Sequence, residues 1–313
     1  MATASSTAPP SFDRAAEALA AASADGRAVR ILGAGTKQYW GGATPADALE
    51  LHTTGLDRVV EHNAGDLTAT LEAGVPLAVA QRTFAAAGQM LALDPPLGTD
   101  GPGPTIGGVV ATADCGPLRH RYGAPRDLVV GMTVALSDGT IAQSGGKVIK
   151  NVAGYDLAKL FSGAFGTLGL ILSVNVRLHP LHELSITALG AATNPEQLSS
   201  AAIELAAAPL EFEALDVAWR SGRGGLLARC AGPQASRRAA RAARLMADHG
   251  LTEVEVAGED GQLWERQRAG QRSAEQALAR ITAAPSELAA VLAATDACDG
   301  TLVGRAALGH SFV

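Results

Sequence analysis

Glycine is concentrated in three short segments of the first half of the chain, and this pattern constrains the fold more than any other feature. The chain has 36 glycines in 313 residues. The three segments span residues 33–37, 101–112 and 145–171. Glycine permits positive φ angles and lets a ligand approach the main chain closely. Consecutive exposed N–H groups then form a concave site for anions such as phosphate. We therefore expect loops that bind a phosphate-bearing ligand.

The first segment reads Gly33-Ala34-Gly35-Thr36-Lys37 and follows a short apolar strand predicted over residues 28–32. Thr36 offers a hydroxyl donor to a phosphate, and Lys37 offers a positive charge. A Rossmann fingerprint would need glycine at position 38, which is Gln38. The P-loop pattern GxxxxGK followed by Ser or Thr occurs nowhere in the sequence. Taken alone, this segment fits a tight turn as well as it fits a phosphate site.

The second segment contains Thr105-Ile106-Gly107-Gly108 and ends at Thr112. Paired glycines let a flat or charged ligand lie against the main chain. A long loop rich in proline and glycine within a compact domain is usually functional. A glycine-packed helix start is the structural alternative, and the spacing favours the functional interpretation only modestly.

The third segment is the densest and carries a family resemblance. It contains KNVAGYDLAKLFSGAFGTLGLI, and the stretch TIGGVVATADCGPLRHRYGAPRDLVVGMTVALSDG precedes it. These stretches resemble the FAD-binding domain of the flavoprotein oxidases related to vanillyl-alcohol oxidase and D-lactate dehydrogenase. Within that family they are most similar to the FAD-binding E subunits of bacterial glycolate oxidases. The resemblance covers about residues 28–180 well and the rest of the chain loosely.

The resemblance implies a cofactor, FAD, and a set of residues that bind it. The first segment would bind the pyrophosphate, and residues 105–108 would line the pyrophosphate and ribityl region. Gly154 and the turn at residues 166–169 would pack near the adenine or the isoalloxazine, while Asn151 and Tyr155 would orient that loop. The cofactor-binding candidates are Gly33, Ala34, Gly35, Thr36, Lys37, Thr105, Ile106, Gly107, Gly108, Thr112, Asn151, Gly154, Tyr155, Gly166, Thr167, Leu168 and Gly169. Many relatives link the flavin through a histidine near the first loop. That loop has no histidine here, so we expect noncovalent FAD.

The sequence departs from its catalytic relatives at two places. Relatives that oxidise α-hydroxyacids carry Gly-Ser-Glu-Gly where this chain has Gly163-Ala164-Phe165-Gly166. They also carry a histidine-bearing motif near the C-terminus, where this chain has only His310. Oxidation of a 2-hydroxyacid needs a base near the α-carbon and a cation for the carboxylate. The sequence offers no convincing pair, so no catalytic residue is assigned.

A flavin without evident substrate machinery indicates a subunit of a larger enzyme. We expect the FAD-binding subunit of a glycolate oxidase-type complex, working with a paralogous flavoprotein subunit and an iron–sulfur subunit on a small 2-hydroxyacid. Two alternatives stay open. One is an autonomous FAD-dependent oxidase or dehydrogenase of another small hydroxyacid or alcohol. The other is an assembly subunit without FAD.

Composition excludes several other classes. The formal net charge is -6 and the pI is about 5.7, which argues against a nucleic-acid-binding protein. No apolar run approaches the ~20 residues of a transmembrane helix. A cytoplasmic protein is therefore expected, with peripheral attachment to the inner membrane through its partners as a further option. The three cysteines form no CxxC pair, so neither a metal nor a self-contained iron–sulfur cluster is expected.

Domain organisation follows from a change in the pattern of elements near residue 181. Residues 1–11 read as a flexible tail, 12–181 as the FAD-binding domain and 182–313 as a cap. The resemblance implies an α+β fold with a two-subdomain FAD-binding domain of the vanillyl-alcohol oxidase (PCMH) type. In the cap, the order βαββαβ predicts a ferredoxin-like plan, followed by a helix over residues 261–278. The sequence ends without a polar closing segment, so a short or missing C-terminal piece is expected.

Overall fold

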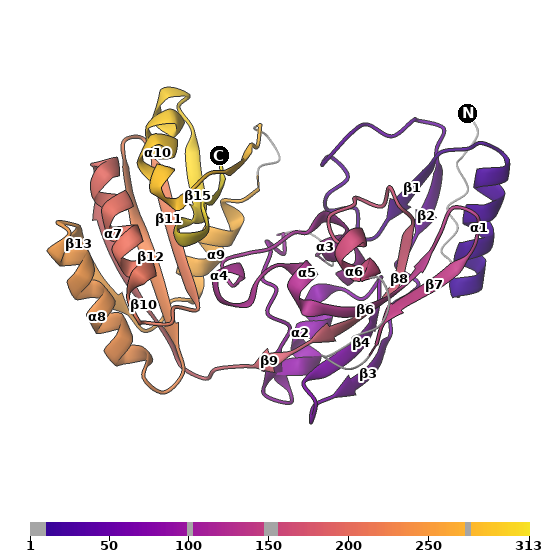
Figure 1. Cartoon of the computed structure of the whole chain (residues 1–313), viewed down its shortest axis with the longest axis horizontal. Coiled ribbons are helices and arrows are strands. Elements are labelled where there is room, and N and C mark those ends of the chain that lie inside the picture. The colour runs from indigo at the N-terminus through magenta and orange to yellow at the C-terminus, as the bar shows by residue number, and fades with distance from the viewer. Residues whose placement is uncertain (1–10, 99–102, 147–155, 273–276) are drawn as a thin grey trace. The chain divides into compact units, whose positions relative to one another are not determined.

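The protein, seen here as a computed structural model, divides into two compact units (Figure 1). The structure describes residues 11–98, 103–146, 156–272 and 277–313. The N-terminal unit comprises residues 1–93, 97–115 and 123–181, and the C-terminal unit comprises residues 94–96, 116–122 and 182–313. Two short segments from the first half of the chain thus belong to the second unit. The candidates Asn151, Gly154 and Tyr155 lie outside the described residues.

The N-terminal unit begins with helix α1 (Phe12–Ala24), which the alanine-rich sequence predicts. Ser11 caps the helix, because its Oγ accepts a hydrogen bond from the Arg14 N–H at 3.4 Å. The apolar face of α1 packs on a two-stranded parallel sheet formed by β1 (Val29–Leu32) and β2 (Leu49–His52). The first glycine segment therefore leaves the sheet from the end of β1.

A five-stranded antiparallel sheet in the order β3-β4-β8-β6-β7 forms the rest of this unit's framework. Its strands are β3 (Val59–Asn63), β4 (Thr68–Glu72), β6 (Val129–Ala135), β7 (Ile141–Gly145) and β8 (Leu170–Arg177). Seven of the eight residues of β8 are buried, as its central position requires. The apolar run of the sequence begins at Leu168, but the strand begins only at Leu170, because residues 168 and 169 precede it outside the sheet.

Short helices connect the strands of the N-terminal unit. They are α2 (Leu77–Ala85), α3 (Ile106–Thr112), α5 (Pro125–Leu128) and α6 (Leu157–Phe161), and a two-stranded ladder joins β5 (Gln89–Met90) to β9 (His179–Pro180). The second glycine segment thus forms a helix, the structural alternative left open by the sequence. Helix α3 packs on β4 and β8, which fixes it against the central sheet.

The C-terminal unit is built on one seven-stranded sheet in the order β13-β10-β12-β11-β15-β16-β14. Its elements are β10 (Ser185–Ala192), α7 (Pro195–Ala207), β11 (Ala214–Arg220), β12 (Arg223–Ala231), α8 (Ala235–Asp248), β13 (Thr252–Ala257), α9 (Gly261–Ala269), β14 (Arg280–Thr282), η1 (Pro285–Glu287), α10 (Leu288–Ala297), β15 (Thr301–Arg305), η2 (Ala306–Leu308) and β16 (His310–Phe312), with α4 (Arg119–Tyr122) added from the first half. The α+β class predicted from the sequence is observed in both units.

Helices cover the two faces of this sheet unequally. Helices α7, α8 and α10 share one apolar core with the side chains of β10, β11, β12 and β15 (Figure 1). On the opposite face Trp264 of α9 packs against Ala214 and Leu227. The predicted helix over residues 261–278 is wrong in its length, because α9 ends at Ala269 and is capped by Gly270. The chain then returns to the sheet as β14.

Candidate cofactor-binding site

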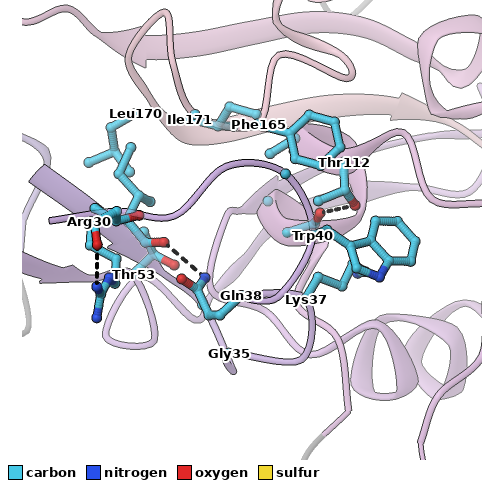
Figure 2. A pocket seen from close by; sticks show the side chains of 18 of the residues that line it. Arg30, Gly35, Lys37, Gln38, Trp40, Thr53, Thr112, Phe165, Leu170 and Ile171 are labelled. Atoms are coloured by element: carbon cyan, nitrogen blue, oxygen red, sulfur yellow. Dashed lines mark hydrogen bonds between the residues drawn. The ribbon is translucent and has the colours of Figure 1, made fainter. Parts of the chain in front are cut away.

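The glycine segments meet around one cavity of about 420 Å³ in the N-terminal unit (Figure 2). Its volume falls within the range of small-molecule and cofactor sites. The predicted residues that line it are Gly33, Ala34, Gly35, Thr36, Lys37, Thr105, Gly107, Gly108, Thr112, Gly166, Thr167 and Gly169. Two candidates in the described chain lie elsewhere, since Ile106 is buried in the core and the Leu168 side chain is exposed. Segments far apart in sequence thus line the same cavity.

The first glycine segment presents unbonded main-chain donors to the cavity. Within the described part of the chain, the N–H groups of Ala34, Gly35 and Thr36 donate no hydrogen bond. The loop that carries them is anchored by Gln38, whose Nε2 donates to the Ile31 carbonyl at 3.3 Å. Three consecutive N–H groups in a fixed loop form the kind of concavity that binds phosphate oxygens.

Glycine is needed in two of the lining segments because neighbouring side chains pack closely against their main chain. A Cβ at position 33 would lie 2.3 Å from Thr105 Oγ1, and a Cβ at position 107 would lie 2.7 Å from the Ala73 Cβ. Thr105 Oγ1 is itself occupied, because it accepts a hydrogen bond from the Gly108 N–H at 3.3 Å at the start of α3. The wall of the cavity is therefore tightly packed at both positions.

Lys37 lies in the cavity wall as part of a buried ion pair. Its Nζ is 3.3 Å from Asp114 Oδ2, and the two side chains are only 5% and 2% exposed. Asp114 follows the end of α3 closely, so the pair ties the first glycine loop to that helix. Asp114 was missed in the sequence, although an aspartate within the apolar run that precedes Cys115 was a usable signal. The Lys37 charge is thus balanced by a carboxylate before any phosphate binds.

The residues present fit FAD. Unbonded N–H groups suit the pyrophosphate, and Trp40 and Phe165 supply apolar surface for flat rings. Among the described residues of the wall, the ionisable groups are Arg30 and Lys37, and Arg30 Nη1 is paired with Glu50 at 3.3 Å. The described wall therefore contains no carboxylate or imidazole that could act as a base.

A second cluster of polar groups lies within the C-terminal unit and was not predicted from the sequence. Arg305 and Asp216 are both fully buried, with Nη1 and Oδ2 3.4 Å apart. Gln267 Nε2 donates to Asp216 Oδ2 at 2.9 Å, and Arg305 Nε donates to the Gly116 carbonyl at 3.1 Å. Asp94 Oδ1 accepts from the Leu118 N–H at 3.0 Å. The cluster thus joins β11 and β15 to the two segments from the first half of the chain.

Burial shifts the titration of this cluster. It raises the pKa of Asp94 to about 7, although Arg268 and Arg305 act in the opposite direction. Burial likewise raises the pKa of Asp216 to about 6, against the effect of Arg305. The pKa of His310 is lowered to about 4 by burial and by Arg119, Arg305 and Arg280. His310 is therefore a neutral imidazole at neutral pH.

These shifts predict that Asp94 makes the C-terminal unit less stable as pH rises. The ordinary pKa of this carboxyl is 3.8, so the folded protein keeps its proton until about pH 7 while the unfolded chain loses it near pH 3.8. The free energy of unfolding should fall over that window. Asp216 acts in the same direction, and His310, whose pKa is lowered, acts in the opposite one. Urea unfolding of wild type and Asp94→Asn between pH 4 and pH 7.5 checks this. The free energy of unfolding of Asp94→Asn relative to that of wild type should rise steadily as pH rises. A difference that stays constant with pH would refute the raised pKa of Asp94.

Comparison with known proteins identifies the cofactor. Residues 7–145 match the family described as FAD binding domain, and the chain is 32% identical over 157 residues to the glycolate oxidase subunit GlcE of Escherichia coli. Residues 7–145 thus match an FAD-binding domain, and the relatives matched are FAD-linked oxidoreductases. The predicted family and the predicted FAD are thereby confirmed, and most of the residues that line the cavity lie within the matched range.

Other relatives of this flavoprotein extend the same assignment. The chain is 33% identical over 187 residues to the glycolate oxidase subunit GlcD of Bacillus subtilis, and 36% identical over 124 residues to a mitochondrial cytochrome-type D-lactate dehydrogenase of Saccharomyces cerevisiae. The matches cover 50%, 59% and 40% of this chain for GlcE, GlcD and the dehydrogenase. They span 44%, 39% and 20% of those proteins, so the flavoprotein covers less than half the length of these relatives.

A solved structure of alkyldihydroxyacetonephosphate synthase shares the fold of this flavoprotein. The two superpose with a TM-score of 0.77 at 13% identity, over 98% of this chain and 69% of the synthase. This likeness concerns the fold alone. Within the part of the chain that the structure describes, no helix has the length and apolar character needed to cross a membrane.

Proposed function

We propose that this flavoprotein is the FAD-binding subunit of a glycolate oxidase-type complex that oxidises glycolate, a 2-hydroxyacid, to glyoxylate. The observation that carries the proposal is the cavity itself. Three unbonded N–H groups face a wall whose described ionisable residues, Arg30 and Lys37, are already paired with carboxylates. Such a site holds a phosphate-bearing cofactor well, but offers no base for a hydroxyacid.

The division of labour follows from these contacts. When bound, FAD would supply the acceptor for the two electrons removed from the substrate. The first glycine loop would bind the pyrophosphate through the N–H groups of residues 34–36, and α3 would hold that loop in place through Thr105 and Asp114. Gly166, Thr167 and Gly169 of the later turn also line the cavity. Binding is proposed to be noncovalent, and the remaining candidates Asn151, Gly154 and Tyr155 keep their proposed role beside the cofactor.

Partner subunits would complete the reaction. GlcE and GlcD are both described as subunits of glycolate oxidase, which supports a paralogous flavoprotein as one partner. An iron–sulfur subunit is proposed to take the electrons onward, since we expect no such cluster in this chain. The complex would lie in the cytoplasm or at the inner membrane surface through its partners.

The C-terminal unit is proposed to be a ferredoxin-like cap that begins near residue 182. Its first six elements run βαββαβ, and the corresponding strands lie in the order β13-β10-β12-β11 with antiparallel neighbours. This is the fourth-first-third-second arrangement expected of that plan. Three further strands extend the sheet beyond β11.

One observation favours the alternative of an autonomous oxidoreductase. The C-terminal unit holds a neutral imidazole, His310, and two carboxyl groups, Asp94 and Asp216, with raised pKa values. Groups with shifted pKa values cluster at catalytic sites. They are buried, however, and Asp216 is committed to Arg305, so we retain the subunit as the main proposal.

Purification of the chain alone and with its partners tests the proposal. The isolated chain should be yellow, should release intact FAD on acid precipitation, and should oxidise glycolate with an artificial acceptor far more slowly than the complex obtained by co-expression with the neighbouring flavoprotein and iron–sulfur genes. Full activity of the isolated chain would establish the autonomous enzyme instead. A colourless chain that cannot be reconstituted with FAD would establish an assembly subunit.

A further inference from the structure

Phe165 has a main-chain conformation that an aromatic residue rarely adopts. Its φ is 55°, in the left-handed region, and it stands beside Gly166, whose φ is 76°. A bulky side chain at such an angle is a genuine outlier and costs free energy unless the surroundings compensate for it. Glycine would adopt this turn at no steric cost, so the aromatic ring calls for an explanation.

Main-chain hydrogen bonds fix the turn that carries Phe165. The Phe165 N–H donates to the Ala111 carbonyl at 2.8 Å, and the Gly163 N–H donates to the Val110 carbonyl at 3.0 Å. Both acceptors belong to α3, which also lines the cavity. The left-handed angle is therefore imposed by attachment of the turn to α3, and the direction of the ring is set with it.

The ring of Phe165 lies in the cavity wall and is still 46% exposed. Its Cδ1 would lie 3.6 Å from a Cβ at Gly41, so its edge reaches the loop that carries the unbonded N–H groups. Figure 2 shows Phe165 and Trp40 on the same side of the pocket, with Thr112 close by. A large apolar ring that is half exposed at a cavity wall is ready to be covered by a flat ligand.

We propose that Phe165 stacks against a ring of the bound FAD and holds it in the cavity. This inference rests on the proposed cofactor site and adds a contact that neither the glycine segments nor the family comparison assigns. Aromatic stacking stabilises a complex beyond the burial of surface alone. The strain of the left-handed angle would then be offset by stronger binding of the cofactor, since the ring occupies a position that a smaller side chain could not reach.

Titration of the apo-protein with FAD tests the stacking contact. Phe165→Ala should weaken FAD binding about tenfold, because the stacking contact and the apolar surface that the ring buries are lost. Phe165→Tyr should restore the affinity. Leu160→Ala is the matched control, because Leu160 is a similarly exposed apolar residue in α6 outside the cavity wall. It should leave the affinity for FAD unchanged.

A second comparison separates stacking from a role in folding alone. Phe165→Gly removes the ring and also the strain, so its apo form should unfold at a higher temperature than the apo form of Phe165→Ala, while both bind FAD equally poorly. If wild type binds FAD and Phe165→Ala binds it with the same affinity, the stacking contact is overturned. Failure of wild type to bind FAD would instead overturn the proposed cofactor site.

Discussion

Gly33→Ala is expected to lower the affinity for FAD by at least about tenfold and to leave most of the purified protein without flavin. The added Cβ would lie 2.3 Å from Thr105 Oγ1, so the first glycine loop and the start of α3 must move apart. Overpacking of this kind costs ~1–3 kcal/mol, and ~1.4 kcal/mol corresponds to a tenfold change in affinity. The displaced loop is the one that presents the N–H groups of Ala34, Gly35 and Thr36. The ratio of flavin to protein absorbance and titration of the apo-protein with FAD measure the effect.

A double variant tests whether the clash with Thr105 causes the loss of affinity for FAD. Gly33→Ala combined with Thr105→Ala removes the clashing hydroxyl, so the double variant should bind FAD better than Gly33→Ala, even though Thr105→Ala alone weakens the helix cap. Gly258→Ala is the control, because a Cβ added at Gly258 would have open space around it, with no neighbouring atom within 4 Å. The steric explanation fails if the double variant binds no better than Gly33→Ala.

Arg305→Met is expected to destabilise the C-terminal unit by ~3–5 kcal/mol, the usual cost of leaving one member of a buried ion pair without its partner. Arg305 and Asp216 are both fully buried, so water cannot replace the lost guanidinium. The loss should be smaller at acidic pH, where Asp216 becomes protonated and neutral. Urea unfolding followed by the fluorescence of Trp219 and Trp264, both buried in this unit, provides the measurement.

Two further variants test whether the loss of stability comes from the burial of the ion pair. Arg223→Met breaks an exposed pair with Glu253 and should cost at most ~1 kcal/mol. Arg305→Met combined with Asp216→Leu replaces both charges by apolar groups and should recover much of the lost stability. A loss of the same size for Arg223→Met and Arg305→Met would show that burial of the pair is not what matters.

The sequence predicted the parts of this molecule that depend on local patterns. Helix α1, the strand β8 and the βαββαβ order all have clear periodicity or apolar runs, and the glycine segments indicated which loops would meet. Even so, the second segment became α3, because the close approach of Gly107 to Ala73 favours a packed helix over an open loop. Local signals specified the elements and their chemistry, but left the pairing of those elements open.

The sequence pattern could not predict the long-range polar contacts. The Asp114 carboxylate meets Lys37 across 77 residues of sequence, and Arg305 meets the Gly116 carbonyl across 189. Neither contact has a periodicity or spacing that marks it. Segments 94–96 and 116–122 also join a unit whose remaining residues begin at His182. An aspartate or arginine of this kind reads as a surface charge until the tertiary fold buries it.

The two-stranded sheet of β1 and β2 should be less stable against local unfolding than the larger sheet of the same unit. A pair of strands is marginally stable by itself, and all four residues of β1 are only half-buried, whereas β8 is almost fully buried in the larger sheet. The loop after β1 should therefore open locally more often than the rest of the domain. A cofactor bound to this loop would suppress its local opening. The main-chain amides of the loop should therefore exchange with solvent more slowly as the concentration of cofactor rises.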